Sequence, residues 1–185
     1  MQLSGVNQYS IEVPEDGRGK HRCVNHSERD RKGKAEMYHE WTREGYVIST
    51  DPRRLDLAAI HQFLAEESYW ARGIERAVVE KAVAHSLCFG LYGDGRQIGL
   101  ARVITDCATY GYLNAVFVLA PSRGQGLGQW LLECVLAHPD LAGVRRFGLT
   151  TRDGQALYAR FGWTALHYPE RHMERLPVDY YQRVR

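Results

Sequence analysis

Apolar and polar residues recur with two different periods from Gly45 to the end of the chain. Short runs rich in β-branched and aromatic residues predict strands over 45–50, 87–92, 97–105, 111–119 and 146–151, with a closing pair over 163–167 and 172–176. Apolar residues three or four positions apart predict helices over 51–69, 74–85, 127–138 and 155–161. The Asp94-Gly95 turn makes 87–105 a hairpin. This order predicts an α/β fold, with a mixed, largely antiparallel sheet and helices on both of its faces.

Residues 1–44 have a different character. Between Gly17 and Lys34 the chain carries seven basic residues and two acidic ones, and apolar residues are almost absent. Such a composition is typical of a solvated or disordered arm, because it offers little apolar surface to bury. We therefore expect a polar, flexible extension over 1–44 and one compact domain over 45–185.

The overall composition argues against several classes of protein. A formal net charge of +2 on 185 residues is too small to indicate a nucleic-acid-binding protein. The four cysteines are far apart and form no Cys-x-x-Cys pair, so neither a disulfide framework nor a zinc site is expected. No signal-peptide pattern is present, and no apolar run approaches the roughly 18 residues of a membrane helix. We expect a cytoplasmic protein without a metal, a membrane segment or a nucleic-acid partner.

Three glycines within five residues, Gly124, Gly126 and Gly128, separate the strand 111–119 from the next helix. Glycines let backbone N–H groups turn toward a ligand, and a helix N-terminus adds unpaired donors and the positive end of a dipole. The segment therefore predicts a cradle for a phosphate-bearing cofactor. A P-loop would require a lysine and a hydroxyl after the last glycine, and a Rossmann loop requires Gly-x-Gly-x-x-Gly in a parallel sheet. The spacing from Arg123 to Gly128 instead matches the acyl-CoA loop Arg/Gln-x-x-Gly-x-Gly/Ala.

Two further segments accompany this loop: the strand Val116–Leu119 before it, and Leu157-Tyr158-x-x-Phe161-Gly162-Trp163 after it. With them, the chain resembles the GCN5-related N-acetyltransferase (GNAT) superfamily from about Tyr46 to the C-terminus. The resemblance implies the GNAT fold and transfer of an acetyl group from acetyl-CoA directly to a primary amine, without a covalent enzyme intermediate. Two-fold dimers are common among relatives, so a homodimer is also an expectation.

The resemblance also implies which residues hold acetyl-CoA. The pyrophosphate is expected on the backbone amides of the loop, and the pantetheine on the strand edge at Phe117 and Val118. Tyr158 matches the family tyrosine that protonates or hydrogen-bonds the departing thiolate. Full proton transfer from a tyrosine of pKa about 10 to a thiolate of pKa about 8.5 is uphill by roughly 2 kcal/mol, which favours a hydrogen bond. The loop residues are Arg123, Gly124, Gln125, Gly126, Leu127 and Gly128.

The general base is less clearly indicated. Neutralising an alkylamine of pKa about 10.4 at pH 7 costs roughly 4.6 kcal/mol, which a base or desolvation must offset. Relatives often place an acid on the strand before the loop, whereas this chain has Asn114-Ala115 there. The remaining candidates are Asp106, which ends the preceding strand, and Glu66 or Glu67, which end the first helix. Deprotonation through water requires none of them.

Acidic and aromatic residues gather between the first two helices, in a segment that often rims the acceptor site of relatives. Charge and cation–π contacts there would suit a cationic amine. We expect a small-molecule amine as the acceptor. A protein lysine or N-terminus is one alternative, and a sensor that binds acyl-CoA without catalysis is another. The expected acceptor-binding residues are Glu67, Tyr69, Trp70, Tyr112 and Asn114.

Overall fold

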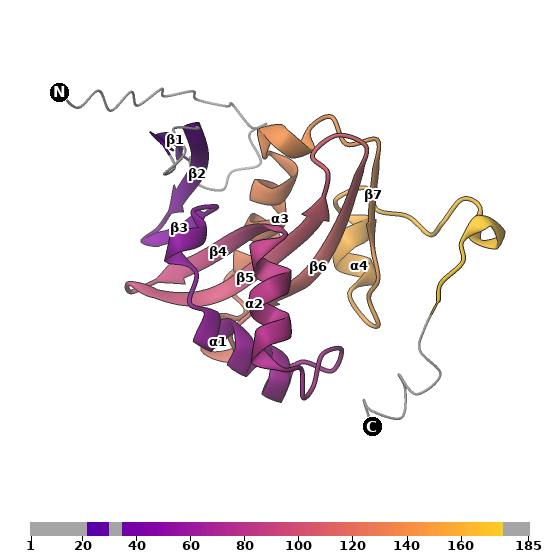
Figure 1. Cartoon of the computed structure of the whole chain (residues 1–185), viewed down its shortest axis with the longest axis horizontal. Coiled ribbons are helices and arrows are strands. Elements are labelled where there is room, and N and C mark those ends of the chain that lie inside the picture. The colour runs from indigo at the N-terminus through magenta and orange to yellow at the C-terminus, as the bar shows by residue number, and fades with distance from the viewer. Residues whose placement is uncertain (1–21, 30–34, 176–185) are drawn as a thin grey trace.

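Seven strands form one sheet, and their order in space follows their order in the chain (Figure 1). The structure is a computed structural model that describes residues 22–29 and 35–175. Neighbouring strands are antiparallel except β6 and β7, which run parallel. The strands are β1 Arg22–Arg29, β2 Ala35–Arg43, β3 Tyr46–Ser49, β4 Leu87–Gly93, β5 Arg96–Thr105, β6 Tyr110–Val118 and β7 Arg146–Leu149.

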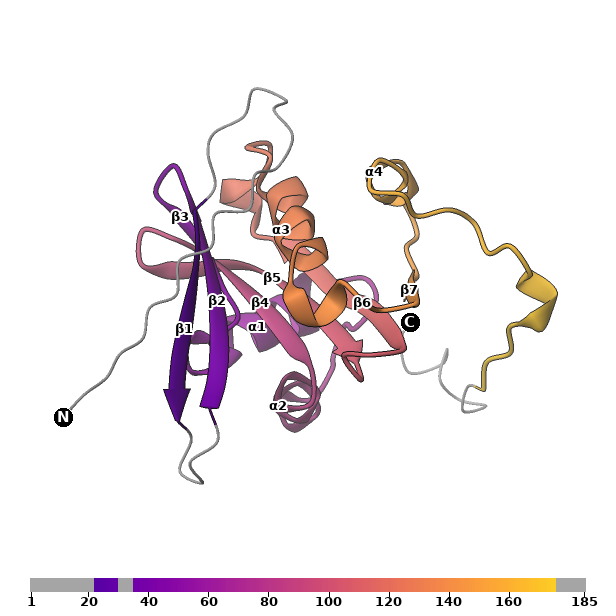
Figure 2. The same ribbon diagram turned by 90° about the horizontal axis from the view of Figure 1, so that it is seen from above.

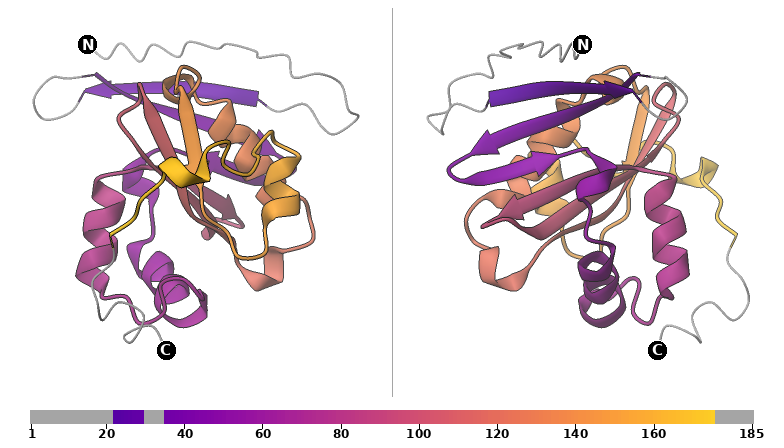
Figure 3. Two further views of the ribbon diagram at one scale, coloured as in Figure 1. Left: turned by 90° about the vertical axis from the view of Figure 1, so that its right-hand side faces the viewer. Right: turned by 60° about the vertical axis from the view of Figure 1, so that its left-hand side comes forward.

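Helices cover both faces of this sheet (Figure 2), which confirms the predicted fold class. Two helices, α1 and α2, lie side by side on one face (Figure 3), and α3 lies on the other. Within residues 22–29 and 35–175, no helix is long and apolar enough to cross a membrane. The helices are α1 Leu57–Gln62, which continues into the π-helical segment η2 Phe63–Glu67, α2 Arg76–Ala84, α3 Leu127–Leu136 and α4 Gln155–Ala159. Short 3₁₀ turns are η1 Pro52–Arg54, η3 Ala120–Ser122, η4 Pro139–Leu141 and η5 Pro169–Arg171.

Side chains of the central strands alternate between two apolar cores. Phe89 of β4 and Val103 of β5 belong to the core beneath α3, where Trp130 is fully buried. Leu100 of β5 and Phe117 of β6 belong to the core beneath α1 and α2. Because neighbouring strand residues point to opposite faces, each central strand contributes to both cores and anchors the helices on both sides.

The N-terminal part of the chain corrects the predicted domain boundary. Residues 35–43 form β2, which pairs with β3, and residues 22–29 form β1 beside it. Trp41 of β2 is only 4% exposed and packs in the core beneath α3. The prediction of a flexible extension over 1–44 is therefore wrong for these two strands, while 1–21 and 30–34 lie outside the described residues. The polar composition was misleading because backbone hydrogen bonds hold a strand at a sheet edge and only one of its faces must be apolar.

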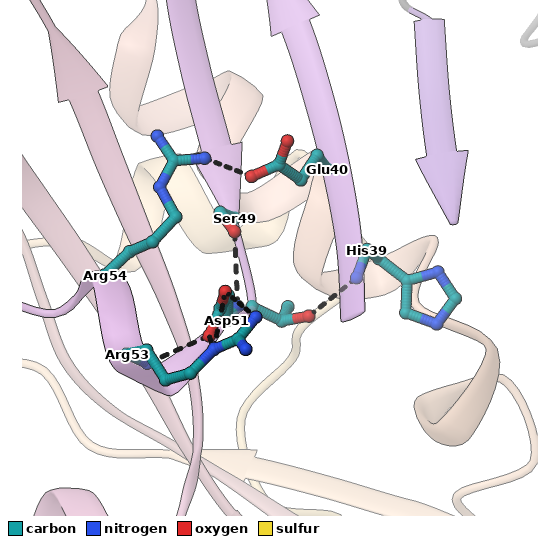
Figure 4. Close-up of polar contacts among 7 residues, drawn as sticks. His39, Glu40, Ser49, Asp51, Arg53 and Arg54 are labelled. Atoms are coloured by element: carbon teal, nitrogen blue, oxygen red, sulfur yellow. Dashed lines mark hydrogen bonds and ion pairs between the residues drawn. The ribbon is translucent and has the colours of Figure 1, made fainter. Parts of the chain in front are cut away.

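Polar contacts connect residues 50–54, which follow β3, to strand β2 (Figure 4). The backbone N–H of Thr50 donates to His39 O at 3.0 Å, and the N–H of His39 donates to Thr50 Oγ1 at 2.9 Å. Asp51 caps η1 with its side chain, and Arg54 of the same turn forms an ion pair with Glu40 of β2. These contacts fix the point at which the chain leaves the sheet toward α1.

The closing strands predicted over 163–167 and 172–176 do not form in the described part of the chain. Residues 163–175 instead run irregularly through η5, and all from 164 onward are exposed. Pro169 has no N–H to donate to a sheet, and Met173 is 98% exposed. An alternating pattern does not make a strand where no core is available to bury its apolar side. Residue 176 lies outside the described residues.

The sheet opens between β6 and β7. Their pairing covers only Tyr110–Leu113 against Arg146–Leu149. Beyond it, β6 carries an irregularity at Ala115 and Val116, where the register with β5 shifts between the pairs Asn114–Arg102 and Phe117–Leu100. Ala115 has a φ of +48°. Such a bulge bends a strand and increases its twist. Among the described residues, the edge of β6 from 114 to 118 therefore faces no neighbouring strand, just before the glycine loop.

Replacing Trp41 with alanine tests whether β2 belongs to the folded domain. The substitution removes buried apolar contacts and leaves a cavity, so we expect the free energy of unfolding to fall by about 3–5 kcal/mol. Urea denaturation followed by circular dichroism measures the change. Met173→Ala is the control, because that side chain is exposed. A loss below about 1 kcal/mol for Trp41→Ala would support the original boundary at residue 45.

Candidate active site at the opening of the sheet

The glycine loop joins the end of β6 to the start of α3. Leu119 N–H donates to Ile98 O at 2.8 Å, and the turn η3 follows. Gly124 and Gly126 have φ angles of +79° and +74°, which residues with a Cβ rarely adopt. Gly126 directly precedes α3, so its left-handed conformation turns the chain into the helix.

The N–H of Arg123 donates to Ala120 O at 3.3 Å, but the other backbone N–H groups of the loop have no acceptor within the part of the chain that the structure describes. None of those from Gly124 to Gly128 donates to another residue. A Cβ placed on Gly124 would meet no atom within 4 Å, so the space above the loop is open. The helix α3 is 10 residues long and adds the positive end of its dipole. This arrangement suits an anionic group such as a diphosphate, and the binding of one there stays a prediction.

Two residues that were not predicted from the sequence support the loop from the β2–β3 hairpin. Tyr46 Oη donates to Gln125 Oε1 at 2.7 Å. Nη2 of Arg43 lies 3.8 Å from the position that a Cβ on Gly126 would occupy. No local pattern signals such contacts, because Tyr46 and Gln125 are 79 positions apart.

The peptide groups of Val118, rather than those of Phe117, face the open edge of β6. Since Leu119 N–H donates to β5, alternation turns the N–H and C=O of Val118 away from β5 and those of Phe117 toward it. The predicted use of the Phe117 backbone is corrected accordingly. Its ring instead stacks on Phe63 with 3.8 Å between centroids. The C=O of Val116 shares a peptide unit with the N–H of Phe117 and points the opposite way, so it also lies on the open edge.

Arg123 binds the strand end. Its Nε donates to Val118 O at 2.7 Å, so this carbonyl is already occupied and the N–H of Val118 is the group that remains for a ligand. The exposed guanidinium of Arg123 makes no other hydrogen bond within the described residues. Its Nη groups therefore remain available to an anion on the loop.

Tyr158 lies on α4, close to the first turn of α3. With the side-chain amide of Gln129 turned so that its oxygen faces Arg160, that oxygen is 2.8 Å from Arg160 Nη1. The ring of Trp163 packs edge-on against Tyr158 at 5.8 Å between centroids. Burial raises the pKa of Tyr158, and Tyr69 acts in the same direction. The hydroxyl is therefore protonated and suited to donate a hydrogen bond, and the raised pKa further disfavours full transfer of its proton.

Two of the predicted acceptor residues, Tyr69 and Tyr112, lie at the connection between β7 and α4. The N–H of Arg152 donates to Tyr69 Oη at 3.2 Å, and the Arg152 guanidinium carbon lies 3.8 Å from the centroid of the Tyr69 ring. Tyr112 Oη donates to Thr150 Oγ1 at 2.9 Å and so joins β6 to the end of β7. Both tyrosines are thus attached to the segment that leads to Tyr158.

Two others, Trp70 and Asn114, line a cavity of about 60 Å³ beneath α1 and α2. Arg102 also lines it, and its Nη2 donates to Asn114 Oδ1 at 3.0 Å while Nη1 donates to Ser86 Oγ at 2.8 Å. Asn114 therefore presents its amide N–H groups to any further partner. The fifth predicted residue, Glu67, is exposed at the end of η2 and does not line this cavity.

A cavity of about 200 Å³ elsewhere in the molecule contains none of the predicted site residues. It is lined in part by His138 and Cys88, and burial lowers the pKa of His138 to about 4 and raises that of Cys88 to about 12. Burial also raises the pKa of Cys107, and Cys134 lies in the core beneath α3. These environments disfavour the thiolates that nucleophilic catalysis needs. Among the described residues, no three His, Cys, Asp or Glu side chains gather to hold a metal ion.

Asp106 caps the turn between β5 and β6. Its carboxylate accepts from the N–H groups of Ala108, Thr109 and Tyr110 at 2.8–3.1 Å, and from the Thr109 hydroxyl at 2.6 Å. These bonds, that of the Thr109 hydroxyl above all, hold the pKa of Asp106 well below its usual range. A carboxylate with so low a pKa is a weak base. The structure thus shows Asp106 as a turn cap, which argues against its predicted role as the catalytic base.

Comparisons with known proteins agree with this geometry. Residues 84–165 match the model of an acetyltransferase (GNAT) domain. A GNAT-family protein from Xanthomonas campestris pv. campestris is 47% identical, and its crystal structure has a TM-score of 0.71 over 74% of this chain and 96% of its own. The chain belongs to the GNAT family of acetyltransferases.

Two further proteins are similar to this GNAT protein at lower identity. A Gibberella zeae protein whose name proposes an acetyltransferase is 34% identical over 142 residues, which cover 65% of this chain and 79% of the relative. A crystal structure from Deinococcus radiodurans R1 is 17% identical, with a TM-score of 0.56 over 74% of this chain and 92% of its own, and supports the fold alone.

Asparagine in place of Asp106 tests the corrected role. The variant keeps a side-chain oxygen for capping, so we expect kcat to stay within about twofold and its pH profile to keep its shape. The melting temperature should fall slightly, because an amide oxygen accepts hydrogen bonds less strongly than a carboxylate. Steady-state rates from about pH 6 to about pH 10 measure this, with Asp94→Asn in the exposed β4–β5 turn as the control. A loss of kcat by about tenfold or more would return Asp106 to the catalytic residues.

Proposed function

We propose that this GNAT protein transfers the acetyl group of acetyl-CoA to the primary amine of a small molecule, directly and without an acyl-enzyme intermediate. The observation that carries the proposal is the row of backbone N–H groups from Gly124 to Gly128, which find no acceptor among residues 22–29 and 35–175. They lie at the N-terminus of α3 and beside an open strand edge. Acetyl-CoA, bound there as the donor, supplies an activated acyl group in its thioester.

The chain offers a separate group for each part of this donor. The loop N–H groups suit its diphosphate, and the outward C=O of Val116 and N–H of Val118 suit the amides of the pantetheine arm. Tyr158, with its raised pKa, suits the departing sulfur as a hydrogen-bond donor. These groups follow the opening of the sheet from the glycine loop toward α4.

The acceptor amine reaches the thioester as the neutral form, and we assign its proton to water rather than to a protein carboxylate. Among residues 38–175, no Asp or Glu side chain is buried. The carboxylate of Asp106 is occupied by its four hydrogen bonds. An amine that loses its proton to solvent reacts faster as the pH approaches its own pKa, so the rate should follow the amine and not an enzyme group.

A small acceptor is favoured by the dimensions of the site. The cavity lined by Trp70 and Asn114 is about 60 Å³, far below the roughly 300–1,000 Å³ typical of pockets for drug-sized ligands. Tyr69 is already in contact with Arg152, through a hydrogen bond to its hydroxyl and through the guanidinium over its ring. Both features suit a short alkylamine better than a folded protein segment.

A panel of acceptors tests the proposal. Purified full-length protein is incubated with acetyl-CoA and with polyamines, amino sugars, arylalkylamines or lysine-containing peptides, and thiol release and acetylated products are measured by absorbance and mass spectrometry. We expect release with at least one small amine. Release with peptides alone would indicate a protein acetyltransferase. Tight binding of acetyl-CoA without release on any acceptor would indicate a sensor, and no binding would overturn the proposal.

Phenylalanine in place of Tyr158 removes the hydroxyl and keeps the ring packed on Trp163. We expect kcat to fall by about tenfold to a hundredfold while the Kd for acetyl-CoA changes little, because the lost hydrogen bond forms mainly with the leaving sulfur. Steady-state kinetics and calorimetry measure the two quantities. Tyr168→Phe, on the exposed C-terminal segment, is the control. An unchanged kcat would remove the proposed role of the hydroxyl.

A further inference from the structure

The β2–β3 hairpin brings an arginine to the glycine loop. Arg43 of β2 lies directly opposite Tyr46 of β3, across a tip in which Glu44 and Gly45 have φ angles of +49° and +85°. Directly opposed residues of an antiparallel pair share one face of the sheet. Tyr46 on this face already binds the loop through Gln125. The hairpin therefore presents Arg43 to the same loop.

The guanidinium of Arg43 is held beside the first turn of α3. Its Cζ lies 4.8 Å from the centroid of the fully buried Trp130 ring, in the geometry of a cation–π contact. Its Nη2 lies 3.8 Å from the position of a Cβ on Gly126, the residue that begins the turn into α3. A permanent positive charge thus lies next to N–H groups that have no acceptor in the described part of the chain.

Arg43 forms no ion pair with a carboxylate among the described residues. Other arginines on the surface do: Arg53 pairs with Asp51, and Arg76 pairs with Glu80 at 2.7 Å. An arginine held against an aromatic ring beside an anion cradle, with its Nη groups not engaged by a carboxylate, is suited to a phosphate.

We propose that Arg43 binds the diphosphate of the acetyl donor, together with the backbone N–H groups of the loop. This inference rests on the proposed function, because it takes acetyl-CoA as the ligand of the loop. The two kinds of donor differ in their action: the N–H groups position the diphosphate, and Arg43 neutralises part of its charge. The contact comes from β2, so a strand outside the segment that matches the family model takes part in holding the donor.

Binding of three donors separates the phosphate contacts. Calorimetry gives the Kd for acetyl-CoA and for its 3′-dephospho form, and competition titrations give that for S-acetylpantetheine, which has no phosphate. For Arg43→Gln we expect the first two affinities to fall by the same factor, about tenfold to a hundredfold, and the third to stay unchanged. Arg43→Lys should recover part of the loss, because it keeps the charge but not the planar fork. Arg76→Gln, on the opposite face of the sheet, is the matched control.

Each other outcome overturns the inference in a recognisable way. Equal affinity of wild type and Arg43→Gln for acetyl-CoA would exclude the contact. A loss that disappears with the 3′-dephospho donor would place Arg43 on the 3′-phosphate instead of the diphosphate. An equal loss with S-acetylpantetheine, or a lowered melting temperature that accounts for it, would show that Arg43 only supports Trp130 and the loop. If wild type binds none of the three donors, the proposed function itself fails.

Discussion

β6 and β7 remain hydrogen-bonded over only four residue pairs, and the rest of the site depends on where that pairing stops. Past Leu113, the bulge at Ala115 and Val116 bends β6 away, and Ala115 takes a positive φ that costs of order 1–3 kcal/mol in a residue with a Cβ. The strand then ends at the glycine loop, whereas β7 leads to α4 and Tyr158. One interruption in the sheet thus leaves an open strand edge, with the N–H of Val118 available to a ligand, between a row of amide donors and a tyrosine hydroxyl.

The parts of this site that the sequence could predict are those encoded by neighbouring residues. The glycine loop is an example: Gly124 and Gly126 have positive φ angles and directly precede an apolar helical repeat, so a short segment of sequence is enough to predict the loop. The helix that carries Tyr158 is likewise a short pattern with its own aromatic signature. The presence of helices on both faces of the sheet could also be predicted, because the periods of strands and helices decide which side chains point toward which core.

The parts that the sequence could not predict depend on register between distant segments. Whether Phe117 or Val118 turns its peptide groups outward is set by the pairing with β5, and a shift of one residue would exchange them. The contacts of Arg43 and Tyr46 with the loop depend on a hairpin whose strand β2 has too few apolar residues to stand out. The capping bonds of Asp106 could not be predicted either, because the N–H groups that donate to it come together only when the turn closes.

The position of β3 between β2 and β4 has a consequence for the segment that carries the family signature. Phe89 and Leu91 of β4 pack with Trp41 and Ile48, which come from the two strands before it. A fragment trimmed to residues 84–165 would leave the edge of β4 unpaired and these apolar side chains open to water. Uncovered edges of this kind recruit strands from other molecules. We therefore expect the segment 84–165, which matches the family model, to aggregate when it is produced alone, because β2 and β3 are needed to cover its edge.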